Sequence, residues 1–315
     1  MNTTRRVLAI SGGVGGAKLA SGLAAVLAPR ELLIVANTGD DFEHLGLTVC
    51  PDLDTLVYTL AGCADPARGW GLAGESWNCL ESLARLGGPD WFRLGDRDLA
   101  MHLRRSALLQ AGRTLSEVTA ELAVALGVHH AIVPMSDAPV RTLVDTERGT
   151  FAFQEYFVRE RCEPGVRALR YSGAEHAQPA PVLRDWVIDR QPLVVVCPSN
   201  PYLSIDPILA VSGMRALLEP LTVVAVSPIV GGRAIKGPAA KMMAELGVPV
   251  SALEVARHYQ GLLQAFVIDR EDEVHADAIT AFGMRVLVTD TVMRVDADRK
   301  RLARELLQFM SGQAQ

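Results

Sequence analysis

The chain has little cysteine, and its five cysteines (Cys50, Cys63, Cys79, Cys162 and Cys197) are scattered. An odd number without C-x-x-C spacing argues against a disulfide framework or a zinc site and favours a reducing compartment. No run of about 18 apolar residues occurs, so no membrane-spanning helix is expected. The apolar run near the N-terminus is too short for a signal peptide and predicts a first strand. We therefore expect a cytoplasmic protein with no membrane partner.

An excess of positive charge is also missing. The chain has 31 Lys and Arg against 36 Asp and Glu, a net charge of −5, and no basic run. This composition does not indicate nucleic-acid binding. About half of the 315 residues are hydrophobic (49%), enough for a large core. The length suggests one large domain or two modest ones; because the strand and helix pattern below forms one continuous core, we expect a single domain over residues 1–315.

Seven short β-branched runs predict strands, at residues 6–11, 31–38, 129–136, 192–199, 221–228, 264–270 and 284–290. Most are continuously apolar, which is typical of strands buried on both faces in a parallel sheet covered by helices. Helical patterns fall at 16–28, 206–219, 238–247, 251–261 and 296–310. The sequence therefore predicts an α/β fold with a doubly wound, mostly parallel sheet.

Two segments interrupt this alternation. Residues 55–127 show no convincing strand and predict a helical insertion that covers the substrate site; one of its helices opens with Thr114 and Glu117 at capping-box spacing. Residues 140–160 predict a β-hairpin that turns at "TERG".

The first predicted strand ends in "SGGVGGAK", with Gly12, Gly13, Gly15, Gly16 and Lys18. Ligands of an open parallel sheet lie beyond the carboxyl ends of its strands, and a helix N-terminus attracts anions. The dinucleotide fingerprint fails because Lys18 stands at its third glycine. The P-loop pattern fails because Ala17 and Leu19 replace its last glycine and its hydroxyl. We expect phosphate binding by neither motif; the alternative is a tight turn without a ligand.

Four aspartates follow the second predicted strand: Asp40, Asp41, Asp52 and Asp54. Clustered carboxylates raise one another's pKa unless a cation neutralises them, and oxygen ligands beside a phosphate site suit Mg²⁺. The alternative is that loop aspartates cap helices, with Asp54 as the N-cap of the next one.

Two more loops are expected at the same edge. "PSNPYLSIDPIL" offers Ser199, Asn200 and Ser204, and "SPIVGGRAIKGPAAKMM" offers Ser227, Gly231, Gly232 and Lys236 as a second anion contact, with Pro238 at a helix start. Within the insertion, Trp70, Trp77, Trp91 and Phe92 suit a flat heterocyclic ligand or form a small core of their own. Arg93, Arg97 and Asp98 are harder to explain by packing.

Together, "SGGVGGAKLASGL", "NTGDDFEHLGL", "CPDLDTLVYTLAG", "WFRLGDRDLAMHLRRS", "VPMSD", "PSNPYLSIDPIL" and "VSPIVGGRAIKGPAAKMM" resemble the 2-phospho-L-lactate transferase family of coenzyme F-420 biosynthesis. The likeness runs from residue 7 to about 290 in the same order. It implies a Rossmann-like fold, a homodimer and Mg²⁺-dependent transfer of a phospho-acid from its GDP-linked form to the ribityl hydroxyl of the deazaflavin Fo, with release of GMP.

The resemblance also implies roles for individual residues. Asp41 and Asp54 would be catalytic and hold Mg²⁺, and Asp54, Arg93, Asp96 and Arg97 would bind Fo. The nucleotide would be held by Gly12, Gly13, Gly15, Gly16, Lys18, Ser199, Asn200, Ser227, Gly232 and Lys236. Asp40 or Asp52 is expected to take the hydroxyl's proton, unless the metal makes a dedicated base unnecessary.

Two rival functions stay open at this point. One is a non-catalytic regulator that binds a nucleotide sugar on the same fold. The other is a nicotinamide dehydrogenase, which the broken glycine fingerprint disfavours. The acid itself is left open among phospholactate, phosphoenolpyruvate and 3-phosphoglycerate, because such ligands differ by few contacts.

Overall fold

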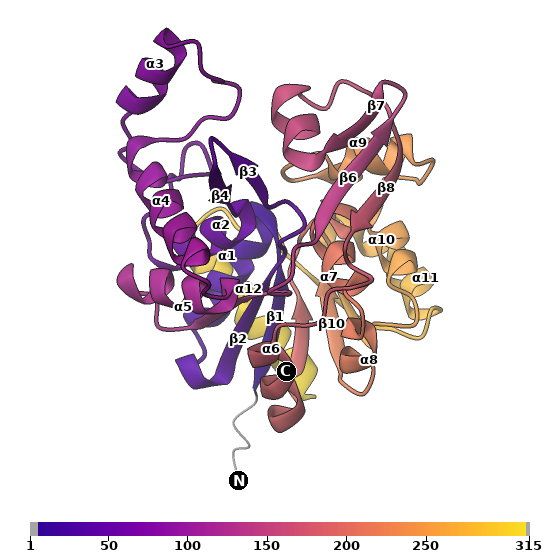
Figure 1. The fold of residues 1–315 in the computed structure, drawn as a ribbon. Coiled ribbons are helices and arrows are strands. Elements are labelled where there is room, and N and C mark those ends of the chain that lie inside the picture. Colours follow the sequence, from indigo (N-terminus) through magenta and orange to yellow (C-terminus); the bar gives the residue numbers. More distant parts are fainter. Residues whose placement is uncertain (1–5, 313–315) are drawn as a thin grey trace.

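The fold is built on a seven-stranded sheet with the strand order β14-β13-β10-β9-β1-β2-β5, and every neighbouring pair is parallel. The computed structural model describes residues 6–312; the two ends of the predicted domain, 1–5 and 313–315, lie outside the described residues. All seven predicted strands belong to this sheet, so the α/β, doubly wound fold class is confirmed (Figure 1).

The sheet strands are β1 (Val7–Ser11), β2 (Leu32–Ala36), β5 (Ala131–Pro134), β9 (Leu193–Val196), β10 (Val223–Val226), β13 (Ala265–Asp269) and β14 (Arg285–Thr289). The helices are α1 (Gly13–Ala24), α2 (Pro51–Leu60), α3 (Asn78–Arg85), α4 (Asp96–Gln110), α5 (Leu115–Ala125), α6 (Pro181–Arg190), α7 (Asp206–Ala210), α8 (Met214–Leu218), α9 (Ala239–Glu245), α10 (Ala252–His258), α11 (Ala276–Thr280) and α12 (Asp296–Ser311).

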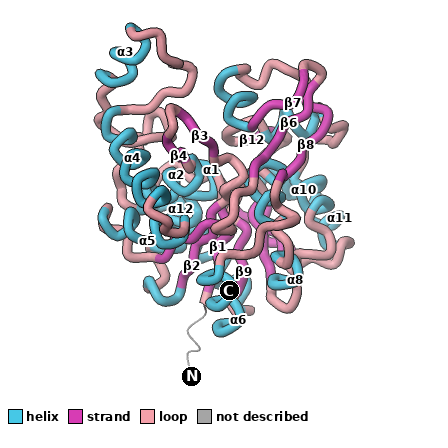
Figure 2. Tube along the Cα trace, viewed as in Figure 1, coloured by secondary structure: helices cyan, strands magenta, loops and turns pink. Residues whose placement is uncertain are grey.

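Short antiparallel strands lie outside the sheet: β3 (Phe42–His44) with β4 (Leu47–Val49), β11 (Ile229–Val230) with β12 (Arg233–Ala234), and a three-stranded unit of β6 (Arg141–Thr146), β7 (Gly149–Ala152) and β8 (Val166–Ser172). The predicted hairpin is thus present as β6 and β7, and β8 adds a strand that the sequence did not indicate. Figure 2 shows this unit above one half of the sheet.

Two buried clusters cover the two faces of the sheet. On one face α1, α2, α5 and α12 contact alternate strand residues such as Ala9 and Ile34. On the other face α6, α7, α8 and α10 contact residues such as Ile10 and Val35. Because both faces are covered, the strands read as continuous apolar runs, which is why the sequence revealed them.

The predicted helices differ from the observed ones in identifiable places. The helix expected at 206–219 is two short helices, because Gly213 takes a left-handed conformation (φ +82°) between them. The β3–β4 hairpin was not expected; its turn places both Leu45 (φ +56°) and Gly46 (φ +71°) in the left-handed region. The capping box of Thr114 and Glu117 is present at the start of α5.

The order of the strands creates a crevice beside β1. The chain runs from β1 to β2 and β5 on one side, then returns to β9 on the other side of β1 and continues to β14. The helices that follow β1 and β9 therefore diverge. The place between β1 and β9 where the strand order reverses is called the switch point, and ligands of open α/β sheets bind there. The glycine turn after β1 and the "PSN" loop after β9 both lie there.

Candidate functional site

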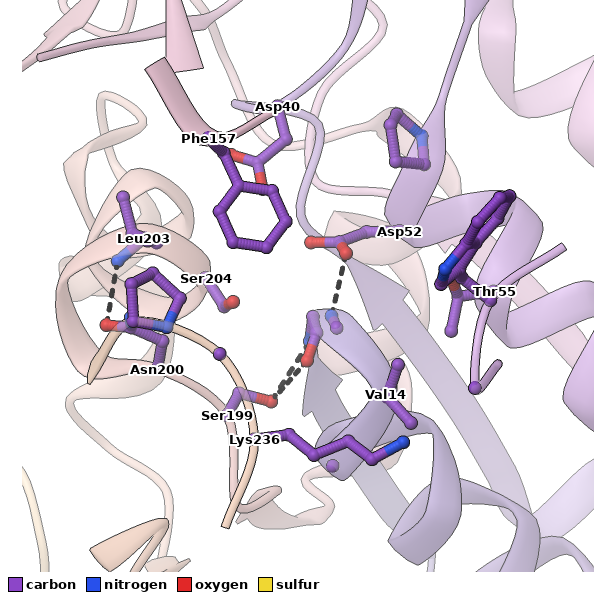
Figure 3. A pocket seen from close by; sticks show the side chains of 18 of the residues that line it. Val14, Asp40, Asp52, Thr55, Phe157, Ser199, Asn200, Leu203, Ser204 and Lys236 are labelled. Carbon is purple, nitrogen blue, oxygen red and sulfur yellow. Dashed lines mark hydrogen bonds between the residues drawn. The ribbon is translucent and has the colours of Figure 1, made fainter. Parts of the chain in front are cut away.

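A cavity of about 650 Å³ opens at the carboxyl ends of the strands. Its wall combines the loops after β1, β2, β9 and β10 with parts of residues 55–127 and of the β6–β8 unit. Of the residues to which the family resemblance gives a role, those in this wall are Gly12, Gly13, Gly15, Lys18, Asp54, Arg93, Ser199, Asn200, Ser227 and Lys236. Loops distant in the chain thus meet at one site (Figure 3).

The glycine turn is fixed to both of its neighbouring loops. The Gly12 amide donates to Ser199 Oγ (3.1 Å), and Ser199 Oγ donates back to the Gly12 carbonyl (2.8 Å). Gly13 has a left-handed conformation (φ +64°), and its amide donates to Asp52 Oδ1 (2.7 Å). Asp52 therefore caps the N-terminus of α1, although it belongs to α2. For this one of the four aspartates, the expectation that an aspartate caps a helix is confirmed.

Two glycines of the turn also serve close packing. A side chain at Gly15 would collide with the Pro198 carbonyl, and one at Gly16 with the hydroxyls of Ser199 and Ser11. These glycines let α1 approach the "PSN" loop across the switch point. Gly16 itself is buried outside the cavity wall.

Two lysines supply positive charge to the cavity. Lys18 donates to the Met293 carbonyl (2.8 Å). Burial lowers the pKa of Lys18, and the nearby charge of Lys236 lowers it further. Lys236 comes from the loop after β10, and its ammonium group lies against the backbone of Gly69. Two ammonium groups that repel each other beside a helix N-terminus suit a polyphosphate.

Three of the four predicted aspartates line the cavity: Asp40, Asp52 and Asp54. Burial raises the pKa of Asp40, and the charge of Asp52 raises it further. Burial raises the pKa of Asp52 to about 6, although Asn37 (Nδ2 to Oδ2, 3.0 Å) and the Gly13 amide stabilise its anion.

Asp41 is buried outside the cavity wall. Burial raises the pKa of Asp41 to about 7, and the negative charge of Asp54 also raises this pKa. The charge of Arg141 and a hydrogen bond from Cys50 act in the opposite direction and lower it. One carboxylate oxygen of Asp40 and one of Asp41 are buried without a hydrogen-bond partner.

This acid set fits a divalent cation. The unpartnered carboxylate oxygens and the mutual repulsion of the acids are what a cation would relieve. Within residues 6–312 no cage of three or more His, Cys, Asp or Glu side chains is present. That donor set agrees with Mg²⁺, which commonly uses one or two carboxylates, water and substrate phosphates.

Asp54 is held by a buried ion pair. Arg105 of α4 binds both of its oxygens, one through Nη1 to Oδ2 (3.1 Å) and the other through Nη2 to Oδ1, and Arg105 is only 3% exposed. His102 Nδ1 lies 3.7 Å from Asp54 Oδ2. Asp54 was weighed as the N-cap of the next helix; α2 instead begins at Pro51, so that alternative is wrong.

A second carboxylate joins this network. Tyr58 donates to Asp98 Oδ1 (2.6 Å), and His102 Nε2 lies 3.5 Å from the same oxygen. Burial raises the pKa of Tyr58 and would raise that of Asp98, but the hydrogen bond and charge of His102 outweigh it, and the pKa of Asp98 is lowered. α2 and α4 thus present a connected polar wall to the cavity.

The insertion supplies the aromatic side of the cavity. The guanidinium of Arg93 lies 4.5 Å from the Trp77 ring centre, and Arg68 lies over both Trp70 and Trp77. Trp91 and Phe92 pack against Phe42 and His44 of the unpredicted hairpin, and both also line the cavity. The rings of Trp91 and Phe92 therefore both pack against the hairpin and form part of the cavity wall.

Some predicted site residues lie elsewhere. Asp96 accepts from Ser76 Oγ (2.6 Å) and from the Cys79 amide (3.0 Å), and Arg97 donates to the Ala73 carbonyl (2.9 Å). Both tie residues 73–79 to α4 rather than line the cavity. Gly232 lies outside the wall as well.

Several wall residues were not predicted from the sequence, namely Tyr58, His102, Phe153, Gln154, Phe157, Val158 and Thr291. A signal existed for two of them. Asp98, His102 and Arg105 recur at helical spacing on one face of α4, as Asp54 and Tyr58 do on α2. Nothing comparable marks residues 153–158, whose position depends on how the β6–β8 unit folds over the sheet.

Comparison with known families gives the site its context. Residues 7–314 match the family described as 2-phospho-L-lactate transferase CofD. The chain belongs to this family. Membership favours a transferase over the dehydrogenase considered above. Within residues 6–312 no helix has the length and apolarity needed to span a bilayer.

Individual relatives agree over nearly their whole length. The 2-phospho-L-lactate transferase of Methanosarcina mazei is 36% identical over 302 residues, covering 96% of this chain and 99% of that protein. A phosphoenolpyruvate transferase of Kitasatospora aureofaciens is 41% identical over 312 residues, covering 95% and 97%. A crystal structure of a UPF0052 family protein from Bacillus halodurans superimposes with a TM-score of 0.60 at 14% identity, covering 96% and 98%, which shows a shared fold.

Proposed function

We propose that this chain transfers a phospho-acid from its GDP-linked form to the ribityl hydroxyl of the deazaflavin Fo, in a Mg²⁺-dependent step of coenzyme F-420 biosynthesis. The hydroxyl oxygen bonds to the phosphorus that carries the acid, the bond from that phosphorus to GMP breaks, and GMP leaves. The observation that carries the proposal is one cavity lined by Lys18, Lys236, Asp54 and Arg93 in a chain of this family.

We assign different residues to the separate requirements of displacement at phosphorus. Such a reaction needs charge neutralisation and an aligned hydroxyl more than a covalent partner. The α1 N-terminus, Lys18 and Lys236 would hold the donor's phosphates, and Arg93 with the aromatic side would hold Fo. Bound at Asp54, with Asp41 nearby, Mg²⁺ would supply further neutralisation of the phosphate oxygens. Asp40 and Asp52 are the proposed acceptors of the hydroxyl's proton.

The names of the relatives indicate which phospho-acids should be tested as the transferred group. The two relatives described above are named for 2-phospho-L-lactate and for phosphoenolpyruvate. The proposal covers both acids and 3-phosphoglycerate. The homodimer and the cytoplasmic location stay predictions.

A product-mass assay tests the function. Purified protein with Mg²⁺, Fo and each GDP-linked acid in turn is expected to give GMP and a phosphodiester of Fo with one of the acids. Omitting Mg²⁺ is expected to abolish the product. Binding of a nucleotide sugar without any turnover of Fo would instead support the non-catalytic regulator.

A further inference from the structure

The segment after β7, residues 153–162, forms one side of the cavity and carries no role in the function proposed above. We call it the strap. Its residues Phe153, Gln154, Phe157 and Val158 line the cavity. Its last turn reaches the other side of the opening, where the Arg159 guanidinium lies 5.8 Å from the Trp91 ring centre. Through this contact the strap touches the insertion of residues 55–127, to which Trp91 belongs.

The strap is held in a fixed and uncommon conformation. Glu155–Arg159 is a π-helical turn, and Arg161 and Cys162 are both left-handed (φ +54° and +56°). Tyr156 anchors it: the side chain is fully buried, its hydroxyl accepts from Lys241 Nζ (3.2 Å), and its carbonyl accepts from the Cys162 amide (3.0 Å). π-helical turns and strained left-handed residues concentrate at functional sites.

This conformation presents one aromatic ring to the cavity. Phe157 stacks on Phe153 with ring centres 5.4 Å apart and planes 13° apart. Phe153 is buried (6% exposed) in the small core beneath the strap, whereas Phe157 is 40% exposed. Figure 3 shows the Phe157 ring pointing into the pocket, whose wall also contains Asp52 and Ser204. Phe157 is therefore a supported ring with exposed area inside the ligand space.

The exposed part of Phe157 leaves apolar ring area facing the cavity, and a ligand that covers this area removes it from water. A fixed aromatic ring pairs best with another flat ring, in offset or edge-to-face contact. We infer that Phe157 is a stacking platform for a flat aromatic heterocycle of a bound substrate.

The inference rests on the proposed function for the origin of that heterocycle. Both proposed substrates carry one: guanine in the donor and the deazaflavin ring in Fo. Both ligands offer a planar ring. Its face would stack on Phe157, while the polar atoms at its edge would form hydrogen bonds with other residues of the cavity. Ring stacking of this kind changes binding by about 5- to 100-fold when the aromatic side chain is removed.

Two binding titrations test the platform and tell the two rings apart. GDP binding and Fo binding are both measured by calorimetry. Four proteins are compared: wild type, Phe157→Ala, Phe157→Tyr, and Ile188→Ala as a control at an exposed apolar residue of α6 outside the cavity wall. Melting temperatures verify that each variant is folded.

The expected result is that Phe157→Ala weakens one of the two ligands by about fivefold or more, while Phe157→Tyr and Ile188→Ala stay within about twofold of wild type. The weakened ligand identifies the stacked ring. Equal binding of both ligands by wild type and Phe157→Ala overturns the platform alone. A wild-type protein that binds neither ligand overturns the proposed function, and the platform with it.

Discussion

Asp54→Asn is expected to lower the transfer rate about a hundredfold or more at saturating substrates, on the scale of removing one electrostatic stabiliser. Asp54 lies in the cavity wall, and its charge acts on Asp41, which has one unpartnered carboxylate oxygen. The proposed cation and the acceptor hydroxyl would meet there. Asparagine keeps the shape and one acceptor for Arg105 but removes the negative charge. The measurement is a single-turnover rate with Mg²⁺, Fo and the GDP-linked acid.

Asp96→Asn is the matched control for this loss. Asp96 is also an aspartate of the "RLGDRD" motif, but it is half-buried, and its oxygens bind residues 76–79 rather than face the cavity. We expect its rate to stay within a few-fold of wild type. A near-normal rate for Asp54→Asn, or an equal loss in both variants, would remove Asp54 from the reaction.

Arg105→Met is expected to destabilise the fold by about 3–5 kcal/mol, because it leaves the Asp54 carboxylate buried without its cation. Arg105 is 3% exposed and binds both Asp54 oxygens, and its Nη1 also lies 3.1 Å from His102 Nδ1. The free energy of unfolding is measured by urea titration. The double variant Arg105→Met with Asp54→Leu is expected to recover part of the loss, since it removes the stranded charge as well.

The neighbouring residue provides the control for the ion pair. Arg104 also pairs with a carboxylate, Glu121, but its side chain is 58% exposed. Arg104→Met is expected to cost less than about 1 kcal/mol, as exposed ion pairs do. If Arg105→Met costs no more than Arg104→Met, the buried pair does not hold Asp54 as described.

The central sheet was predictable because its strands are buried on both faces, which leaves a continuous apolar run in the sequence. The meeting of the glycine turn with the "PSN" loop was also predictable, since parallel strands deliver the loops that follow them to one edge. Short elements were less visible. β3 and β4 have three residues each, and their turn uses Leu45 in a left-handed conformation that leucine rarely adopts.

The direction of each side chain at the site could not be predicted from the sequence. Asp96 and Asp98 are two residues apart on one helix, yet Asp98 faces the cavity and Asp96 faces residues 73–79. Among the acids after β2, the sequence could not show that Asp52 caps α1 while Asp41 is buried beside the wall. Phe157 depends on a π-helical turn in a unit that folds over the sheet from far along the chain. Such placements follow from tertiary contacts that no local pattern encodes.

The central claim is that one cavity holds both substrates around a cation at Asp54, and a crystal structure with Mg²⁺, GDP and Fo tests it most directly. The account predicts the GDP phosphates against the glycine turn near Lys18 and Lys236, Fo beside Arg93, and the cation bound to the Asp54 carboxylate between them. GDP bound outside this cavity, or a cation held away from Asp54, would contradict it.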